Sequence, residues 1–319
     1  MSNTIWNRED ASTVGLDPTQ LNQFERAISK HKILSCLIIK DDHLVFEYYK
    51  NLKCEDKLHK INSCTKSIMS ALIGIAVEQG IIPTIETPIA SYFPSLNRDP
   101  DERKRMITIE HLLTMSAGFD WPEFGEWQGF PRMIHDSNWI RYTLNRNLLE
   151  DPGDAMNYNS GCSHLLTAIL QQASGMDAEQ YARKYLFGPL GINEFRWYED
   201  AQGIKQGGFG LCMTTRDIAK FGCLYLNNGK CHNKQLVPTD WIASTTVPCY
   251  LTYPYIGHYA KHWWTSNDEG LGNYYFALGF GGQYIVVVPE ANMVIAMNSD
   301  LYEDSLLPMR MIRDCFNSL

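Results

Sequence analysis

The segment 67–79 constrains the fold most, because it is compatible with a helix and apolar on nearly every face. A helix without a polar face belongs in a protein interior, covered by other elements on all sides. Gly80 follows directly and is expected to end the helix. A chain of 319 residues with 45% hydrophobic content can build one large core, or two domains, around such a helix.

Ser63 and Lys66 stand where this helix should begin. If Ser63 were only a helix cap, Glu or Gln would be preferred three residues later, and a lysine has the wrong charge for that end. Residues i and i+3 share a helix face, so the amine can reach the hydroxyl. A neutral lysine needs its pKa lowered by about 3 units, roughly 4 kcal/mol, which burial and the helix end can supply. The pair predicts a serine nucleophile with a lysine base, and a cap with a stray lysine is the alternative.

The same spacing occurs once more, at Ser29 and Lys32. That pair ends a polar amphipathic helix and leads into a strand, so both side chains are expected to be solvated. A short motif of this kind arises by chance, and its context separates the two copies.

Helical and strand patterns divide the chain into three parts. Helices are expected at 18–31, 109–115, 139–144, 163–173, 178–186 and 306–316. Strands are expected at 34–40, 43–49, 262–266, 274–278, 283–288 and 293–298. Strands from both ends of the chain then join one antiparallel sheet flanked by the first and last helices, an α+β fold with an inserted all-helical lobe.

This pattern predicts a discontinuous sheet domain, 1–75 and 200–319, and an inserted helical domain, 76–199, with the active site at the seam. The longest irregular stretch, 119–138, contains Trp121, Trp127 and two prolines. It suits a binding loop or lid, and a purely structural loop fits equally well because tryptophans pack well.

Composition excludes several classes of protein. The formal net charge is −8 and no basic run is interleaved with aromatic residues, so no nucleic-acid partner is expected. The first ten residues lack the apolar core of a signal peptide and no segment has the length of a membrane span, so a cytoplasmic location is expected. Nine cysteines without a C-x-x-C pair favour reduced thiols over disulfides or zinc, and Cys64 is expected to pack as a small residue.

Two further segments contain chemically useful residues. Residues 152–160 (PGDAMNYNS) place Tyr158 in a Gly-rich turn just before a helix. Residues 279–283 (GFGGQ) lie between two strands, where glycines let the backbone approach a ligand closely.

Serine, lysine, tyrosine and a glycine-rich strand edge, in this order and spacing, resemble the serine β-lactamase and penicillin-binding protein superfamily. Within it the chain is most similar to the class C β-lactamase-like branch, which includes family VIII carboxylesterases and 6-aminohexanoate-dimer hydrolases. The resemblance runs from about residue 14 to residue 311 and is supported by the stretches 111–121, 210–222 and 281–289.

The resemblance implies that Ser63 is the acylated nucleophile and Lys66 the base that activates it. Tyr158 would share proton transfer and protonate the leaving group, although its hydroxyl could instead cap the adjoining turn. The oxyanion hole would consist of the backbone N–H groups of Ser63 and Gln283. Gly281 and Gly282 would allow that approach.

Two departures from the family pattern affect substrate binding. Ser160 replaces the Asn of the usual Tyr-x-Asn motif, which leaves its contact with substrate open. Phe280-Gly281-Gly282 stands where β-lactamases have Lys-Thr-Gly, so the cation that would bind a substrate carboxylate is missing. This argues against penicillin as the natural substrate, and Phe280 and Trp121 are expected to line an apolar pocket.

Other polar residues have simpler interpretations. His59 is expected in a surface loop or strand end, and His262 in a strand near the pocket rim. Asp217 opens a helix after two threonines, where capping explains it. No helical His-x-x-x-His pair with a carboxylate appears, so no metal site is expected.

The sequence therefore predicts a serine hydrolase that cleaves a small ester or amide and uses no metal or organic cofactor. A D-amino-acid peptidase, an amidase or a β-lactamase-type hydrolase is the alternative within enzymes. A non-catalytic acyl- or peptide-binding protein of the same fold is the alternative of another class. The natural substrate and the oligomeric state stay open.

Overall fold

A nine-stranded sheet forms the centre of the computed structural model, which describes residues 6–123, 129–253 and 256–316. The strand order is β1-β3-β2-β14-β13-β12-β11-β10-β9. The bounds are β1 Asn7–Arg8, β2 Ile33–Lys40, β3 His43–Tyr49, β9 Tyr250–Leu251, β10 His258–Tyr259, β11 Trp264–Asp268, β12 Gly272–Gly279, β13 Gln283–Val288 and β14 Met293–Ser299. Every neighbouring pair is antiparallel except β1 with β3.

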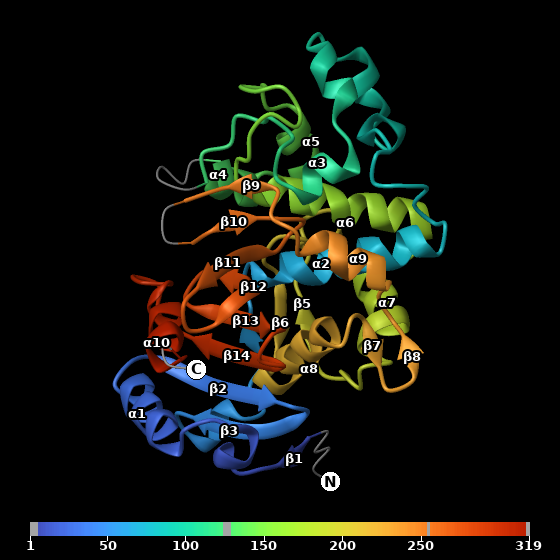
Figure 1. Cartoon of the computed structure of the whole chain (residues 1–319). Coiled ribbons are helices and arrows are strands. Elements are labelled where there is room, and N and C mark those ends of the chain that lie inside the picture. Colours follow the sequence, from blue (N-terminus) through green and yellow to red (C-terminus); the bar gives the residue numbers. More distant parts are fainter. Residues whose placement is uncertain (1–5, 124–128, 254–255, 317–319) are drawn as a thin grey trace.

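Both ends of the chain contribute to this sheet, as the strand patterns predicted. β2 pairs with β14, so the N-terminal hairpin extends the C-terminal strands (Figure 1). Val, Ile and Leu side chains dominate β2 and β13, β14 is largely apolar, and β13 and β14 are buried along their whole length. Such runs fit strands that are covered on both faces.

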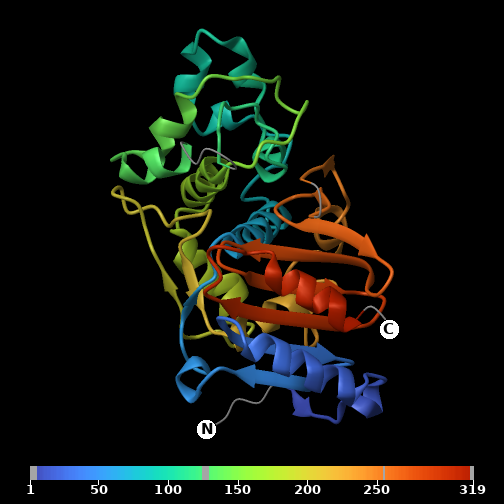
Figure 2. The ribbon, with the colours of Figure 1, turned by 90° about the vertical axis from the view of Figure 1, so that its left-hand side faces the viewer.

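Helices cover both faces of the sheet. α1 (Pro18–Ser29) and α10 (Leu307–Phe316) pack against each other, and Figure 2 shows them in front of the strands. α8 (Thr215–Leu226) packs on β2, β13 and β14. The predicted α+β sheet flanked by the first and last helices is confirmed.

The apolar segment forms α2 (Cys64–Glu78), which lies between the sheet and the helical lobe. It packs on β12 and β13 and on α6 (Ser160–Ser174), and its residues from Cys64 to Ala76 are buried. Gly80 follows the helix with a φ of 67°, a left-handed conformation that suits glycine. The helix begins at Cys64, directly after Ser63 as expected, and the polar side chains of its first turn are buried.

Most of the remaining helices lie in the upper half of Figure 1, and α7 lies lower, at the height of the central strands. They are α3 Ile109–Leu113, α4 Gly129–His135, α5 Trp139–Leu144, α6, and α7 Ala178–Ala182, which continues as a π-helical turn over Arg183–Phe187. The predicted boundary after residue 75 falls inside α2, which serves both lobes. The division into two domains stays a prediction.

Short elements complete the described chain. They are β4 His59–Lys60, β5 Arg196–Trp197 and β6 Leu211–Met213 in one small sheet, β7 Lys230–Cys231 with β8 Lys234–Gln235, and α9 Thr239–Thr245. Single 3-10 turns occur at Ala11–Val14, Leu52–Cys54, Ile89–Ser91, Pro94–Arg98 and Glu102–Met106. Among the described residues, the helices are too short or too polar to cross a lipid bilayer.

Candidate active site

Ser63 occupies the N-cap position of α2, but its side chain makes no capping hydrogen bond. The residue is partly exposed, whereas the following residues of the helix are buried. Asn62 precedes it with a φ of 46°, and the Asn62 side chain donates a hydrogen bond to the Phe280 carbonyl at 2.6 Å. The hydroxyl thus lies at the surface end of a buried helix and is not used to cap it.

Lys66 points back along the same helix face toward Ser63. Its Nζ lies 3.1 Å from Ser63 Oγ and donates to Ser160 Oγ and to the Gly208 carbonyl, each at 2.9 Å. Only 1% of the residue is exposed. Burial lowers the pKa of Lys66 to about 8, and the nearby Glu123 carboxylate opposes that shift.

Tyr158 lies on the other side of the same two groups. Its ring centroid is 4.6 Å from Lys66 Nζ, and its hydroxyl is hydrogen-bonded with Ser63. The ring stacks on Trp264 at 5.8 Å. Burial and the Glu123 charge raise the pKa of Tyr158 well above its usual value, and the bond with Ser63 opposes this. The phenol is therefore neutral at physiological pH, a state that can donate a proton.

Two residues that sequence reasoning missed complete the surroundings of Lys66. Glu123, which is 6% exposed, accepts from Ser160 Oγ at 2.6 Å, and Gly208 supplies the carbonyl. Gly208 follows Gly207, whose position leaves no room for a side chain, because a Cβ there would lie 2.2 Å from the Ser163 carbonyl. The sequence signals were an acidic residue in an aromatic loop and a Gly-Gly pair before β6.

The third position of the Tyr-x-Asn motif is resolved by the structure. Ser160 begins α6, is 1% exposed, and joins Lys66 to Glu123 through its hydroxyl. Its partner is thus the lysine, and the side chain is turned inward.

The glycines of the strand edge shape the backbone here, and their expected approach to substrate stays a prediction. Gly281 and Gly282 have φ values of 85° and 82°, so they are needed for the turn between β12 and β13. A Cβ at Gly281 would touch Tyr302 and one at Gly282 would touch Pro308. The glycine that allows β12 to approach the nucleophile is Gly279, where a Cβ would lie 2.3 Å from the Ile61 carbonyl.

We therefore expect Gly279→Ala to lower kcat/KM by about 100-fold, because the added methyl must push the Ile61 to Ser63 segment away from the strand. A stability loss of about 1–3 kcal/mol should accompany it. Ester hydrolysis and thermal unfolding measure the two effects. Gly203→Ala is the control for activity, since Gly203 has open space around it, and its φ of 79° makes alanine strained, so this variant also loses stability but should keep the wild-type kcat/KM. An unchanged kcat/KM in Gly279→Ala would contradict the proposed steric function.

The remaining predicted site residues lie nearby in different environments. Gln283 begins β13; its carbonyl accepts from the Cys64 thiol at 3.5 Å, and its side chain binds the Ser299 backbone. Phe280 is 43% exposed and packs on Tyr302. The oxyanion function of Gln283 and the substrate contact of Phe280 stay predictions.

Trp121 is 1% exposed and its indole N–H donates to Glu123 at 2.8 Å. Substrate contact by this ring would require it to move, and that prediction stays untested. Trp127 and the rest of 124–128 lie outside the described residues, so the suggested lid cannot be compared with the structure.

The prediction for His262 was wrong, and that for His59 was right about the strand but wrong about its exposure. His59 lies in β4 but is buried, with 6% exposure, because β4 pairs with β6 under the site. His262 precedes β11 with a φ of 65°, so it lies in a turn. It binds the Leu113 carbonyl through Nδ1 and Ser163 through Nε2, and burial lowers its pKa to about 3. These contacts make His262 a neutral structural bridge.

The simpler interpretations of Cys64, Asp217 and the second motif are confirmed. Cys64 is fully buried in the first turn of α2. Thr214 caps α8 and exchanges hydrogen bonds with Asp217. Ser29 and Lys32 are exposed.

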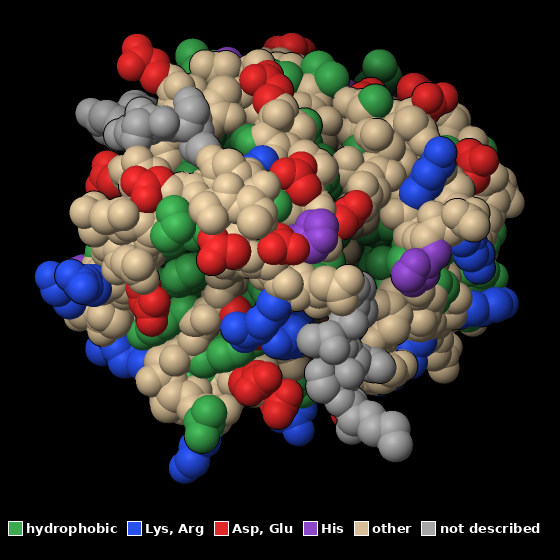
Figure 3. Space-filling model, turned by 60° about the horizontal axis from the view of Figure 1, so that its bottom comes forward, with side chains coloured by type: hydrophobic (Ala, Val, Ile, Leu, Met, Phe, Trp, Pro, Cys, Tyr) green, Lys and Arg blue, Asp and Glu red, His purple; other side chains and the backbone are tan. Residues whose placement is uncertain are grey.

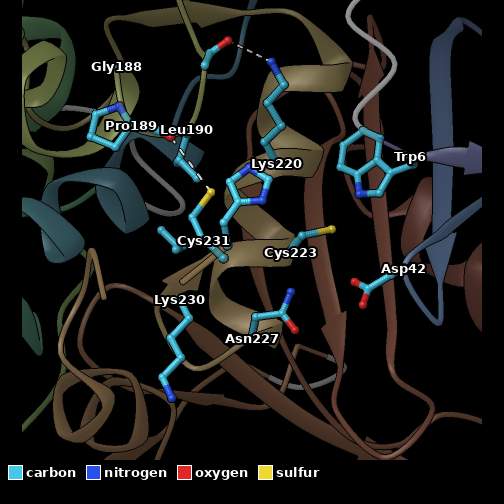
Figure 4. A pocket seen from close by; sticks show the side chains of 13 residues that line it. Trp6, Asp42, Gly188, Pro189, Leu190, Lys220, Cys223, Asn227, Lys230 and Cys231 are labelled. Atoms are coloured by element: carbon cyan, nitrogen blue, oxygen red, sulfur yellow. Dashed lines mark hydrogen bonds between the residues drawn. The ribbon is translucent and has the colours of Figure 1, made fainter. Parts of the chain in front are cut away.

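A cavity of about 740 Å³ lies away from these residues (Figure 4). Its lining includes Trp6, Asp42, Lys220 and Cys223, and the Lys220 amine is bound to the Gly191 carbonyl and to Asp217.

Figure 3 shows acidic and basic side chains interspersed over the lower face of the molecule. In the described part of the chain, no three His, Cys, Asp or Glu side chains are grouped to hold a metal ion.

The sequence of this chain is similar to those of known proteins. Residues 21–305 match the family model described as Beta-lactamase. The 6-aminohexanoate-dimer hydrolase of Paenarthrobacter ureafaciens is 22% identical over 301 residues, covering 87% of this chain and 75% of that protein.

Two solved structures share the fold. EstCE1, a hydrolase with promiscuous acyltransferase activity, has a TM-score of 0.78 and 15% identity over 94% of this chain and 99% of that one. A class C beta-lactamase has a TM-score of 0.74 and 14% identity over 97% of each chain.

Proposed function

Because the chain belongs to the beta-lactamase family, in its class C-like branch, we propose that it is a serine hydrolase that cleaves a small ester or amide through an acyl-enzyme on Ser63. One observation supports this most directly. The partly exposed Ser63 hydroxyl lies 3.1 Å from a buried lysine amine whose pKa is lowered to about 8. A lysine in that state is a base within reach of a nucleophile.

In the first step Lys66 takes the proton of the Ser63 hydroxyl while Oγ forms a bond to the substrate carbonyl carbon. The bond from that carbon to the leaving oxygen or nitrogen then breaks, and the leaving group takes a proton from Tyr158. Lys66 then gives Tyr158 the proton that it took, which restores both groups; its amine lies 4.6 Å from the centre of the Tyr158 ring. Neutral Lys66 next takes a proton from a water molecule as the water oxygen bonds to the acyl carbon. The bond from that carbon to Ser63 Oγ then breaks, Lys66 returns the proton to Oγ, and a carboxylic acid is released.

The developing oxyanion would be stabilised by the backbone N–H groups of Ser63 and Gln283. Ser63 stands at the N-terminus of α2, where the helix dipole favours negative charge. The Gln283 backbone contacts the first turn of the same helix through Cys64.

Uncharged substrates fit this site better than penicillin. Phe280 stands where a cation would bind a substrate carboxylate, and its ring is 43% exposed. The relative from Paenarthrobacter ureafaciens is named for hydrolysis of a 6-aminohexanoate dimer, and EstCE1 for hydrolysis with acyl transfer. A panel of short p-nitrophenyl esters against D-amino-acid amides would separate an esterase from the amidase and peptidase alternatives.

The pH dependence of the reaction follows from Lys66. As pH falls through about 8 the amine gains a proton and ceases to be a base, so kcat/KM should drop about tenfold per unit below that pH and level off above about 9. Ester hydrolysis between about pH 6 and about pH 10 measures this. An acid limb centred near the ordinary lysine pKa of 10.5 would contradict a base tuned by burial.

Covalent labelling tests the function without knowledge of the substrate. A fluorophosphonate probe should give one adduct by intact mass, and peptide mapping should place it on Ser63. An adduct elsewhere would refute the proposed nucleophile. A folded protein that binds acyl ligands but forms no adduct would instead favour the non-catalytic binding protein.

A further inference from the structure

Glu123 is a buried carboxylate with three hydrogen bonds to donors around the site. Its Oε2 accepts from the Ser160 backbone N–H at 2.7 Å and from the Trp121 indole at 2.8 Å. Its Oε1 accepts from the Ser160 hydroxyl at 2.6 Å. An ionised carboxylate only accepts, so each of these partners must donate to it.

The orientation of the Ser160 hydroxyl follows from this. A serine hydroxyl has one hydrogen, and Ser160 gives that hydrogen to Glu123. Toward Lys66, 2.9 Å away, Ser160 can therefore only accept. The Gly208 carbonyl, at the same distance from Lys66, also only accepts.

A neutral lysine amine has two hydrogens and one lone pair. Ser160 and the Gly208 carbonyl take both hydrogens, so the lone pair is directed at the third neighbour, Ser63 Oγ, 3.1 Å away. If the Ser160 hydroxyl turned, it would donate to that lone pair and compete with Ser63 for it.

We propose that Glu123 is a positioning residue, which locks the Ser160 hydroxyl as an acceptor and thereby aims the lone pair of neutral Lys66 at Ser63. Glu123 can have this function only if Ser63 and Lys66 act as proposed above. The same carboxylate also biases the charge of the lysine.

Glu123 supplies the negative charge that acts on the Lys66 amine. The other titratable groups that surround the amine are Cys64, Tyr158, Cys162 and His262. Burial raises the pKa of the two thiols and of the phenol and lowers that of the imidazole, so all four are neutral near pH 8. Removing the carboxylate charge should therefore lower the pKa of Lys66 further.

Glu123→Gln separates positioning from a merely structural function. The amide oxygen is needed where two N–H groups converge, so the amide NH₂ faces Ser160 Oγ and turns the serine hydroxyl toward Lys66. We expect the plateau of kcat/KM for a p-nitrophenyl ester to fall about 10- to 100-fold. The acid limb should also move to lower pH. Glu194→Gln, an exposed acid with the same charge change, should leave both unchanged.

Ser160→Ala provides the second variant. Without the hydroxyl there is nothing for Glu123 to orient, so adding Glu123→Gln to Ser160→Ala should lower the plateau by less than it does alone. The acid limb should still move, because the charge acts through space. Additive losses of the plateau would overturn the positioning function.

A structural function predicts a different result. Glu123→Gln would then lower the melting temperature while the plateau per folded molecule and the position of the acid limb stayed the same, and this would overturn the proposal. Competitive acylation of Lys66 with acetic anhydride across pH reports its ionisation without turnover. An enzyme with no fluorophosphonate adduct refutes the proposed function, whereas a Glu123→Gln enzyme that forms the adduct and keeps the wild-type plateau of kcat/KM refutes the proposal on Glu123.

Discussion

Ser63→Ala should abolish the fluorophosphonate adduct and lower kcat/KM for a small ester by about 10⁴-fold or more. Lys66 contacts two hydroxyls, those of Ser63 and Ser160. Ser160 is 1% exposed and donates to Glu123, so it cannot replace the partly exposed Ser63 as nucleophile. Intact mass and initial rates measure both effects.

The chain contains its own control for this experiment. Ser29 has the same spacing to Lys32, and both residues are exposed at the end of α1. Ser29→Ala should label and turn over like the wild type. An adduct that survives in Ser63→Ala and disappears in Ser29→Ala would show that Ser29 is the nucleophile and would contradict the proposal.

Lys66→Met should lower kcat/KM by about 10³-fold. Methionine keeps most of the length of the stem, but its thioether is too weak a base to take the Ser63 proton and has no donors for Ser160 and Gly208. The residual activity should lose the acid limb near pH 8, because the group that titrates there is gone. The pH profile of residual hydrolysis checks this.

Lys66→Met should also change how the free energy of unfolding depends on pH. Between about pH 8 and 10.5 the unfolded chain binds the Lys66 proton more tightly than the folded chain, so wild-type stability gains a contribution that rises with pH. Lys66→Met should lack this rise, and the exposed Lys32→Met should keep it. Denaturant unfolding at several pH values measures this. If the free energy of unfolding rose equally with pH in the wild type and in Lys66→Met, the lowered pKa of Lys66 would be contradicted.

The sheet and the central helix could be predicted because their signals are local. β-branched runs indicated β13 and β14, and continuous apolar character indicated α2. Ser63 and Lys66 were recognisable because three residues in one helix fix their separation. The same pair marked the start of the helix, and α2 begins at Cys64 with Ser63 at its N-cap.

The other half of the site depends on contacts between distant segments. Glu123 meets Ser160 across 37 residues, and Lys66 meets the Gly208 carbonyl across 142. A carboxylate in a loop and a backbone oxygen have no periodicity that would indicate such a partner. The same holds for the glycines. The sequence does not say that Gly281 and Gly282 have positive φ and Gly279 does not, because this depends on how β12 pairs with β13.

Lys66 lies on a helix whose backbone amides are expected to be among the slowest to exchange with solvent, because α2 is buried between the sheet and α6. Exposing these amides requires the surrounding layers to separate. The nucleophile and its base should therefore persist until the chain unfolds cooperatively. Exposed loops can fluctuate earlier while the proton-transfer pair stays assembled.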